Sequence, residues 1–270
     1  MQVDTELFAQ RALWLAQHAL VLYGLTLALL LLLAWFGWWA LRRGPLAGSP
    51  HWPTRPRRLA LGAMVVMLGA VVFTGLASQI GPGSALGQAD LALGEALSVS
   101  LGGPALQVFA ALTHLGDTAT LTGLCIGVAL MLVASGRHGQ ALGWVVAVAG
   151  DGLLNQSLKS HFGRVRPHYP DALFSAQGLS FPSGHSSGAV VAYGMLAYLA
   201  LRLLPPRWHL AVLLAALALA FTVGTSRVWL GVHFASDVLG GFASGTAWLA
   251  LCVTSMELLR GWHAARRARQ

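Results

Sequence analysis

Three short polar stretches interrupt a chain that is otherwise strongly apolar. They are residues 159–167 (KSHFGRVRP), 182–185 (PSGH) and 226–237 (SRVWLGVHFASD). Each contains basic side chains or histidines, and the last ends in a carboxylate. These residue types predict a site that binds an anion and also carries groups able to transfer protons or attack an electrophile.

Five residues of these stretches have the chemistry of a phosphate site. Lys159, Arg166 and Arg227 can surround a dianion, because a guanidinium offers a planar fork to phosphate oxygens and an ammonium acts as a point charge. Ser183 and Gly184 precede an apolar helix, where backbone N–H groups and the helix dipole favour an anion. Gly184 also lets the backbone approach closely.

Two histidines and one carboxylate could carry out the reaction. His233 and Asp237 are four residues apart, so on a helix they share a face. The carboxylate can accept the proton of one imidazole nitrogen, which fixes the tautomer and leaves the other nitrogen free to attack. His185 is then available as the general acid and base.

The combination predicts function more strongly than any one stretch. Alone, PSGH reads as a helix start with Ser183 as its N-cap. Asp117 is interpreted either as a helix cap or as a site residue. Arg164 is interpreted as an interfacial charge. Four further histidines are interpreted as satisfied polar groups: His114, His161, His168 and His209.

The composition predicts that these residues sit in a membrane protein. Apolar residues make up 56% of the 270 residues and charged residues only 10%, against about 25% charged in soluble domains. A soluble domain, a disordered chain and a nucleic-acid binder are thereby disfavoured. Seven segments are long and apolar enough to cross a bilayer, the fourth and fifth marginally: 18–41, 59–80, 118–136, 140–158, 186–204, 209–226 and 236–257.

The segments between and within these spans carry further expectations. Residues 81–115 are too interrupted to span and are expected to form a loop with one or two short helices near the surface. Asp151 and Asn155 share a helix face with Lys159. Asp151 is expected to be satisfied by another span, the alternative being that it orients Lys159. Cys125 and Cys252 are expected to be buried thiols.

The arginines predict the orientation. Twelve of the sixteen lie after spans one, three, five and seven, and basic loops stay in the cytoplasm. The C-terminus is therefore expected inside, with the N-terminus and all three polar stretches outside. The net charge of +8 is then mostly a topology feature. The acidic start of the chain predicts no cleaved signal peptide.

In its motifs the chain resembles the type 2 phosphatidic acid phosphatase superfamily of membrane lipid phosphatases. The family pattern K-x6-R-P, P-S-G-H, S-R-x5-H-x3-D is matched without departure, and the resemblance covers about residues 59–257. It implies an all-α, polytopic membrane helix bundle with a six-span core. Residues 1–58 would add one N-terminal span and a basic cytoplasmic loop, and 258–270 a basic cytoplasmic tail.

The resemblance also implies roles for the site residues. His233 would form a phosphohistidine, Asp237 would orient it and His185 would be the general acid. The phosphoryl oxygens would be bound by five residues: Lys159, Arg166, Ser183, Gly184 and Arg227. No metal and no cofactor are expected.

The sequence thus predicts hydrolysis of a lipid phosphomonoester or diphosphate at the outer face of a bacterial inner membrane. Candidate substrates are undecaprenyl diphosphate, phosphatidylglycerol phosphate, phosphatidic acid and phosphorylated lipid A. The alternatives are a phosphotransferase with the same site, a vanadium haloperoxidase, which the spans disfavour, and a non-catalytic protein that binds or transports a phospholipid. The expected partners are the lipid and the bilayer, with no nucleic acid.

Overall fold

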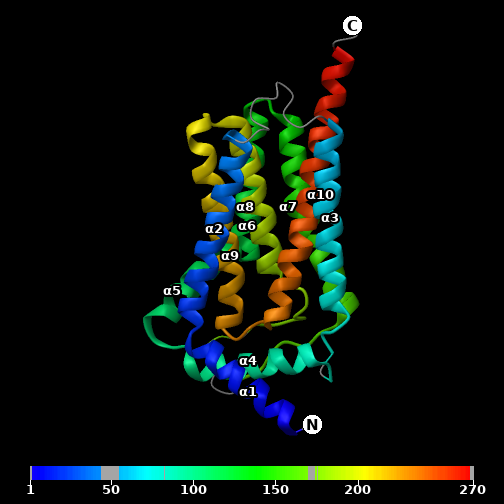
Figure 1. Ribbon diagram of the computed structural model, residues 1–270. Coiled ribbons are helices and arrows are strands. Elements are labelled where there is room, and N and C mark those ends of the chain that lie inside the picture. Colours follow the sequence, from blue (N-terminus) through cyan, green and yellow to red (C-terminus); the bar gives the residue numbers. More distant parts are fainter. Residues whose placement is uncertain (1, 44–54, 82, 170–173, 175, 268–270) are drawn as a thin grey trace.

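A computed structural model describes residues 2–43, 55–81, 83–169, 174 and 176–267, and the regular structure in them is helical (Figure 1). The predicted all-α membrane helix bundle is confirmed. Part of the arginine pattern that predicted the orientation falls outside the described residues or side chains: Arg43, Arg55, Arg57, Arg58, Arg267 and Arg269.

Seven long helices occupy the seven predicted positions and run side by side in Figure 1. They are α2 (Ala19–Arg43), α3 (Arg55–Ala77), α6 (Thr118–Ala134), α7 (His138–Phe162), α8 (Gly184–Leu203), α9 (His209–Trp229) and α10 (Ala235–Arg267). Among the described residues, five helical stretches are long and apolar enough to cross a membrane: 19–40, 59–77, 184–203, 206–229 and 235–262. α6 has only 17 residues, and polar residues reduce the hydropathy of α7.

The polar face of α7 is turned into the bundle. Asp151 and Asn155 are buried, and both contact Ser187 on α8. The Ser187 hydroxyl lies 3.1 Å from Asp151 Oδ2, and Asn155 Nδ2 lies 3.3 Å from Ser187 Oγ. The prediction that another span satisfies Asp151 is confirmed, and these bonds fix the start of α8 against α7.

Two glycines bring α10 against the start of α8. A Cβ atom at Gly245 would lie 2.9 Å from the backbone Cα and oxygen of Ser187, and one at Gly241 would lie 2.5 Å from the carbonyl oxygen of Ser183. Small residues of this kind allow close helix approach inside membranes. The backbone of α10 therefore lies directly on the segment that carries PSGH.

Short helices lie at one end of the bundle. They are α1 (Gln2–Gln17), α4 (Ala85–Ser100) and α5 (Gly103–Thr113), followed by the 3-10 turn η1 (His114–Gly116). In Figure 1, α1 and α4 lie across the end opposite the C-terminus. Short helices within 81–115 are confirmed. The helix α1 was not predicted, because the start of the chain lacks a clear apolar period.

The additional N-terminal helix pair packs on the rest of the molecule. In α2, the Tyr23 hydroxyl lies 2.6 Å from Oγ1 of Thr222 on α9. The Tyr23 ring makes edge contacts with Phe109 and Trp229. At the α1–α2 junction, Ala16 belongs to the same apolar cluster. The pair is thus anchored to α5 and α9, whose ends lie beside the polar stretches.

Candidate active site

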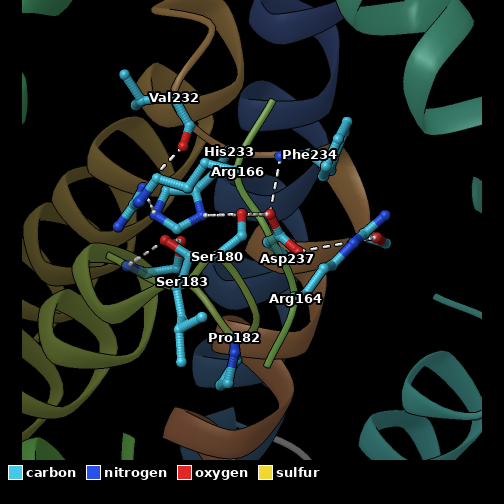
Figure 2. A network of polar contacts seen from close by, with 12 residues as sticks. Arg164, Arg166, Ser180, Pro182, Ser183, Val232, His233, Phe234 and Asp237 are labelled. Carbon is cyan, nitrogen blue, oxygen red and sulfur yellow. Dashed lines mark hydrogen bonds and ion pairs between the residues drawn. The ribbon is translucent and has the colours of Figure 1, made fainter. Parts of the chain in front are cut away.

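His233 and Asp237 form a buried pair at the junction of α9 and α10 (Figure 2). His233 Nδ1 lies 3.3 Å from Asp237 Oδ2. The same oxygen accepts the backbone N–H of Phe234 at 2.9 Å and the hydroxyl of Ser180. His233 therefore lies in the turn before α10 and not on the helix. The Asp237 carboxylate caps the start of α10 by accepting the backbone N–H of Phe234, as in a capping box.

The other nitrogen of the His233 ring faces a cation. Nε2 lies 2.8 Å from Arg166 Nη1. A guanidinium can only donate, so Nε2 accepts, and the ring proton belongs on Nδ1, facing Asp237. Burial lowers the pKa of His233 to about 3. The imidazole is therefore neutral, with a lone pair on Nε2.

Lys159 and Arg166 are held by backbone carbonyls, mainly those of the loop before α8. Lys159 Nζ, at the end of α7, donates to the carbonyls of Leu179 at 2.5 Å and Ser180 at 3.3 Å. Arg166 donates from Nε to Gln177 at 3.1 Å and from Nη1 to Val232 at 2.8 Å. Burial lowers the pKa of the Arg166 guanidinium from its ordinary value, and the charge of Asp237 opposes this.

Arg227 completes the cluster of cations from the last turn of α9. Its Nη1 donates to Thr113 Oγ1 at 2.9 Å. Its Nε is buried and has no hydrogen-bond partner among the described residues, so this donor is free to bind an anion or a water molecule. The charge of Arg227 repels those of Lys159 and Arg166. An anion between the three would relieve this repulsion.

Ser183 differs in part from the expectation. Its backbone N–H donates to the carbonyl of Asp237 at 3.0 Å, because α8 and α10 approach so closely there, so it does not point at an anion. Its hydroxyl accepts the N–H of Ser186 at 3.4 Å, which confirms the N-cap interpretation. Gly184 begins α8, and a Cβ there would lie 3.0 Å from Asn155 Oδ1.

His185 lies in the first turn of α8 and is paired with a carboxylate. Its Nε2 is 2.8 Å from Asp117 Oδ1, and the other Asp117 oxygen is 2.7 Å from His114 Nδ1. Asp117 stands at the N-cap position of α6, but its side chain makes no cap hydrogen bond. Of the two interpretations of Asp117, helix cap or site residue, the structure favours the site residue. The contact with Asp117 also gives His114 the polar partner that was predicted for it.

Burial and hydrogen bonding act in opposite directions on Asp117. Burial raises the pKa of its carboxyl, whereas the hydrogen bonds and charges of His114 and His185 lower it. The histidines outweigh burial, so the pKa lies below its ordinary value. Asp117 is therefore ionised at neutral pH.

The interpretation of Arg164 as an interfacial charge is wrong. Its side chain is only 10% exposed and joins two carboxylates. Nη1 lies 2.7 Å from Asp237 Oδ1, and Nη2 lies 2.8 Å from Asp90 Oδ2. Asp90, on α4, also accepts the N–H of Ser236 at 3.1 Å. Arg164 thus connects the helix that crosses the end of the bundle to the carboxylate that holds His233.

Three contributing residues were missed from the sequence, namely Asp90, Ser180 and Ser236. Asp90 carried one sequence indication, since an acid among apolar residues near a membrane usually has a partner. The two serines carried none, because serines are common at loops and helix starts.

A pocket of about 460 Å³ opens beside this cluster. Arg164 and Arg166 contribute the charged part of its wall. The apolar part comes from Ile80, Leu91, Phe162, Val165 and Phe234. The Val165 side chain at this pocket is 78% exposed. The pocket therefore combines an apolar wall with a cationic one.

A helical membrane bundle that brings histidines, carboxylates and cations to one end has the features of the PAP2 superfamily. The model of that superfamily matches residues 140–260, a range that contains all three polar stretches. Phosphatidylglycerophosphatase B of Bacillus subtilis is 37% identical over 141 residues, covering 52% of this chain and 69% of the relative. The chain belongs to the PAP2 superfamily, as its motifs predicted.

Two other comparisons agree. The lipid A 1-phosphatase of Rhizobium johnstonii is 34% identical over 193 residues, covering 58% of this chain and 73% of the relative. The crystal structure of the transmembrane PAP2 type phosphatidylglycerolphosphate phosphatase from Bacillus subtilis superposes with a TM-score of 0.67 at 33% identity. It covers 71% of this chain and 96% of that chain. The protein is a membrane protein whose relatives are lipid phosphatases.

Proposed function

We propose that this protein hydrolyses the phosphomonoester or diphosphate of a lipid through a phosphohistidine on His233, at the outer face of a bacterial inner membrane. The observation that carries the proposal is the arrangement around His233. One ring nitrogen faces Asp237, and the other faces Arg166 with its lone pair. This is the arrangement that a neutral imidazole nucleophile needs.

In the first step, His233 Nε2 attacks phosphorus and the bond to the leaving oxygen breaks. His185 gives that oxygen a proton, which is worth about 10²–10⁴-fold in rate. Phosphoryl transfer places charge on the equatorial oxygens, so fixed cations supply most of the remaining stabilisation. Lys159, Arg166 and Arg227 supply these cations. Ser183 and Gly184 lie beside them at the start of α8.

In the second step, water attacks phosphorus while His185 takes its proton. The phosphorus–nitrogen bond breaks and inorganic phosphate leaves. Asp237 holds the Nδ1 proton of His233 throughout, so Nε2 returns as a lone-pair nitrogen. The three cations neutralise the phosphoryl dianion, and no step requires a metal ion.

The pocket beside the cations supports a lipid substrate. Its apolar wall includes Leu91 and Phe162, and its cationic wall includes Arg166. If the phosphate of a lipid binds Arg166, the apolar part of that lipid would lie along the apolar wall of the pocket. A lipid that stays partly in the bilayer can meet both requirements.

The outer-face location rests on the arginine pattern of the loops and on the place of the site. The polar stretches gather at the end of the bundle opposite the C-terminus (Figure 1). With the basic loops and tail in the cytoplasm, this end faces the periplasm.

The decisive experiment is phosphate release by the purified full-length protein in detergent, with EDTA and without added alcohol. The panel comprises phosphatidylglycerol phosphate, phosphatidic acid, lipid A 1-phosphate and undecaprenyl diphosphate. We expect release from at least one lipid and an acid-labile phosphoryl label that is lost in His233→Ala. Binding of a lipid without release would overturn the proposal in favour of a binding protein. Release only with an acceptor alcohol would indicate a phosphotransferase.

A further inference from the structure

The active-site end contains a second histidine–carboxylate pair. Asp117 comes from the start of α6 and His185 from the first turn of α8, 68 residues apart in sequence, with 2.8 Å between Oδ1 and Nε2. The side chain of Asp117 is 38% exposed and that of His114, on its other oxygen, is 72% exposed. His185 Nε2 therefore faces a carboxylate that is partly open to the surface.

We propose that Asp117 is a positioning residue for His185, holding its ring by Nε2 and stabilising its protonated form so that Nδ1 can deliver the proton. The inference rests on the proposed function, since it concerns the group that protonates the leaving oxygen. In the first step Nδ1–H passes its proton to that oxygen. In the second step Nδ1 takes a proton from water. In both steps the Nε2–H group keeps its proton and stays hydrogen-bonded to Asp117.

The packing around His185 supports this use of its two nitrogens. A Cβ atom at Gly116 would lie 3.1 Å from Cδ2 of His185, so the Cδ2 edge of the ring faces η1. Nδ1 is on the opposite edge of the ring and is directed away from η1. Contact with Gly116 and the bond to Asp117 therefore fix one edge of the ring and leave the other for the substrate.

The charges around His185 explain why it needs a carboxylate. Burial acts most strongly against a positive charge on this ring, and the charges of Arg227 on α9 and Arg166 in the loop after α7 act in the same direction. Asp117 is the carboxylate in contact with it, and an opposite charge in contact favours the charged form. Asp117 in turn is faced by His114 as well as by His185.

The two carboxylates of the site have different partners. Asp237 shares its charge with Arg164 and the Ser180 hydroxyl as well as with His233, which suits a neutral nucleophile. Asp117 bonds two histidines, so more of its charge acts on His185. Different environments for two similar pairs separate the nucleophile from the acid.

The test uses Asp117→Asn in the full-length protein, with the best lipid phosphate of the panel above. We expect kcat to fall about 10–100-fold, as for residues that orient a reacting group, with KM changed less than about threefold. Without the carboxylate, His185 loses its proton at lower pH. The basic limb of the kcat–pH profile should therefore move down by about one unit or more.

Three controls keep the result interpretable. The position of the pH limb does not depend on the folded fraction, so a poorly folding variant still reports it. Asp117→Glu, which keeps the charge, should return the limb toward its normal position. Glu95→Gln removes an exposed acid from α4 and should leave the profile unchanged. In a His185→Ala background, Asp117→Asn should add less than about twofold.

An unmoved basic limb in Asp117→Asn, or a full additional loss in the His185→Ala background, would overturn the inference. These outcomes are distinct from a failure of the proposed function, in which the wild-type protein itself releases no phosphate from any lipid.

Discussion

Arg164 contacts the oxygen of Asp237 that does not face His233. Its guanidinium lies between Asp90 and Asp237 at 2.8 and 2.7 Å and over the ring of Phe234 at 4.2 Å. It therefore neutralises two buried carboxylates at once. The position accounts for a basic residue that does not belong to the proposed phosphate-binding set.

Arg164→Met should destabilise the protein. It would leave the carboxylates of Asp90 and Asp237 buried without their cation, and breaking a buried pair typically costs about 3–5 kcal/mol. Thermal unfolding in detergent measures the change. Arg207→Met, at an exposed position outside the site, should unfold like the wild type, and equal unfolding of both variants would refute a structural role for Arg164.

The His233–Asp237 pair should be indispensable. His233→Ala should abolish turnover, because the phosphoryl acceptor is lost. Asp237→Asn should lower kcat about 10²–10⁴-fold, since the amide no longer fixes the Nδ1–H tautomer. Rates of phosphate release from the best lipid measure both effects. Wild-type activity in either variant would refute the roles given to these residues.

Lys159, the only lysine of the chain, should not tolerate arginine. Its ammonium group fits between the carbonyls of Leu179 and Ser180, and a planar guanidinium needs more room and a different geometry. We expect Lys159→Arg to lower kcat/KM at least about tenfold, with Arg207→Lys as the matched control. Near-normal kinetics would make the lone lysine a matter of composition.

At the residue scale, the candidate site residues could be selected from local patterns. Three motifs contain His185, His233, Asp237 and the three cations. The supporting residues could not be predicted, because Arg164 and Asp90 meet only through the fold. For Asp117, the sequence allowed a cap or a site residue, and only the contact with His185 favours the second.

Among the helices, the contact between α8 and α10 positions the site most directly. It sets the start of α8, which carries His185, against the start of α10, which carries Asp237, with Ser183 N–H bonded to the Asp237 carbonyl. Glycine at position 245 permits this approach, because the atoms facing it belong to the backbone of Ser187. A backbone contact cannot relax as a side chain can.

Gly245→Ala should therefore disturb both stability and activity. We expect a loss of about 1–3 kcal/mol from overpacking and a lower kcat, since His185 and Asp237 would move apart. Thermal unfolding and phosphate release report the two effects. Gly127→Ala on α6 is the matched control, because no atom lies within 4 Å of a Cβ added there. If both variants behave like the wild type, the close contact does not position the site.

The long apolar helices could be predicted from the sequence, whereas helices with a polar face were harder to predict. All seven expected apolar segments are helices, since a chain in lipid must satisfy its backbone internally. The hydropathy of α7 is reduced by Asp151 and Asn155. These polar residues do not face lipid, because they bond to Ser187 on α8. The helix α1 has no comparable apolar run, and its position against α4 comes from tertiary packing.

For the whole molecule, the proposed orientation has a direct test by cysteine labelling in intact cells. Ser98→Cys lies at an exposed position of α4, and Arg207→Cys lies at the other end of the bundle. A membrane-impermeant maleimide should label Ser98→Cys from the periplasm and Arg207→Cys only after permeabilisation. The wild-type chain gives the background of Cys125 and Cys252. The reverse pattern would place the active site in the cytoplasm.

The bridge made by Arg164 has a consequence for how the chain is synthesised. Its partners lie 74 residues earlier, at Asp90, and 73 residues later, at Asp237. The arginine is therefore made with one carboxylate already present, and the other arrives only when α10 begins to insert. Chains that end before α10 would contain Arg164 and Asp90 without the Asp237 carboxylate. We expect membrane quality-control proteases to degrade such chains rapidly.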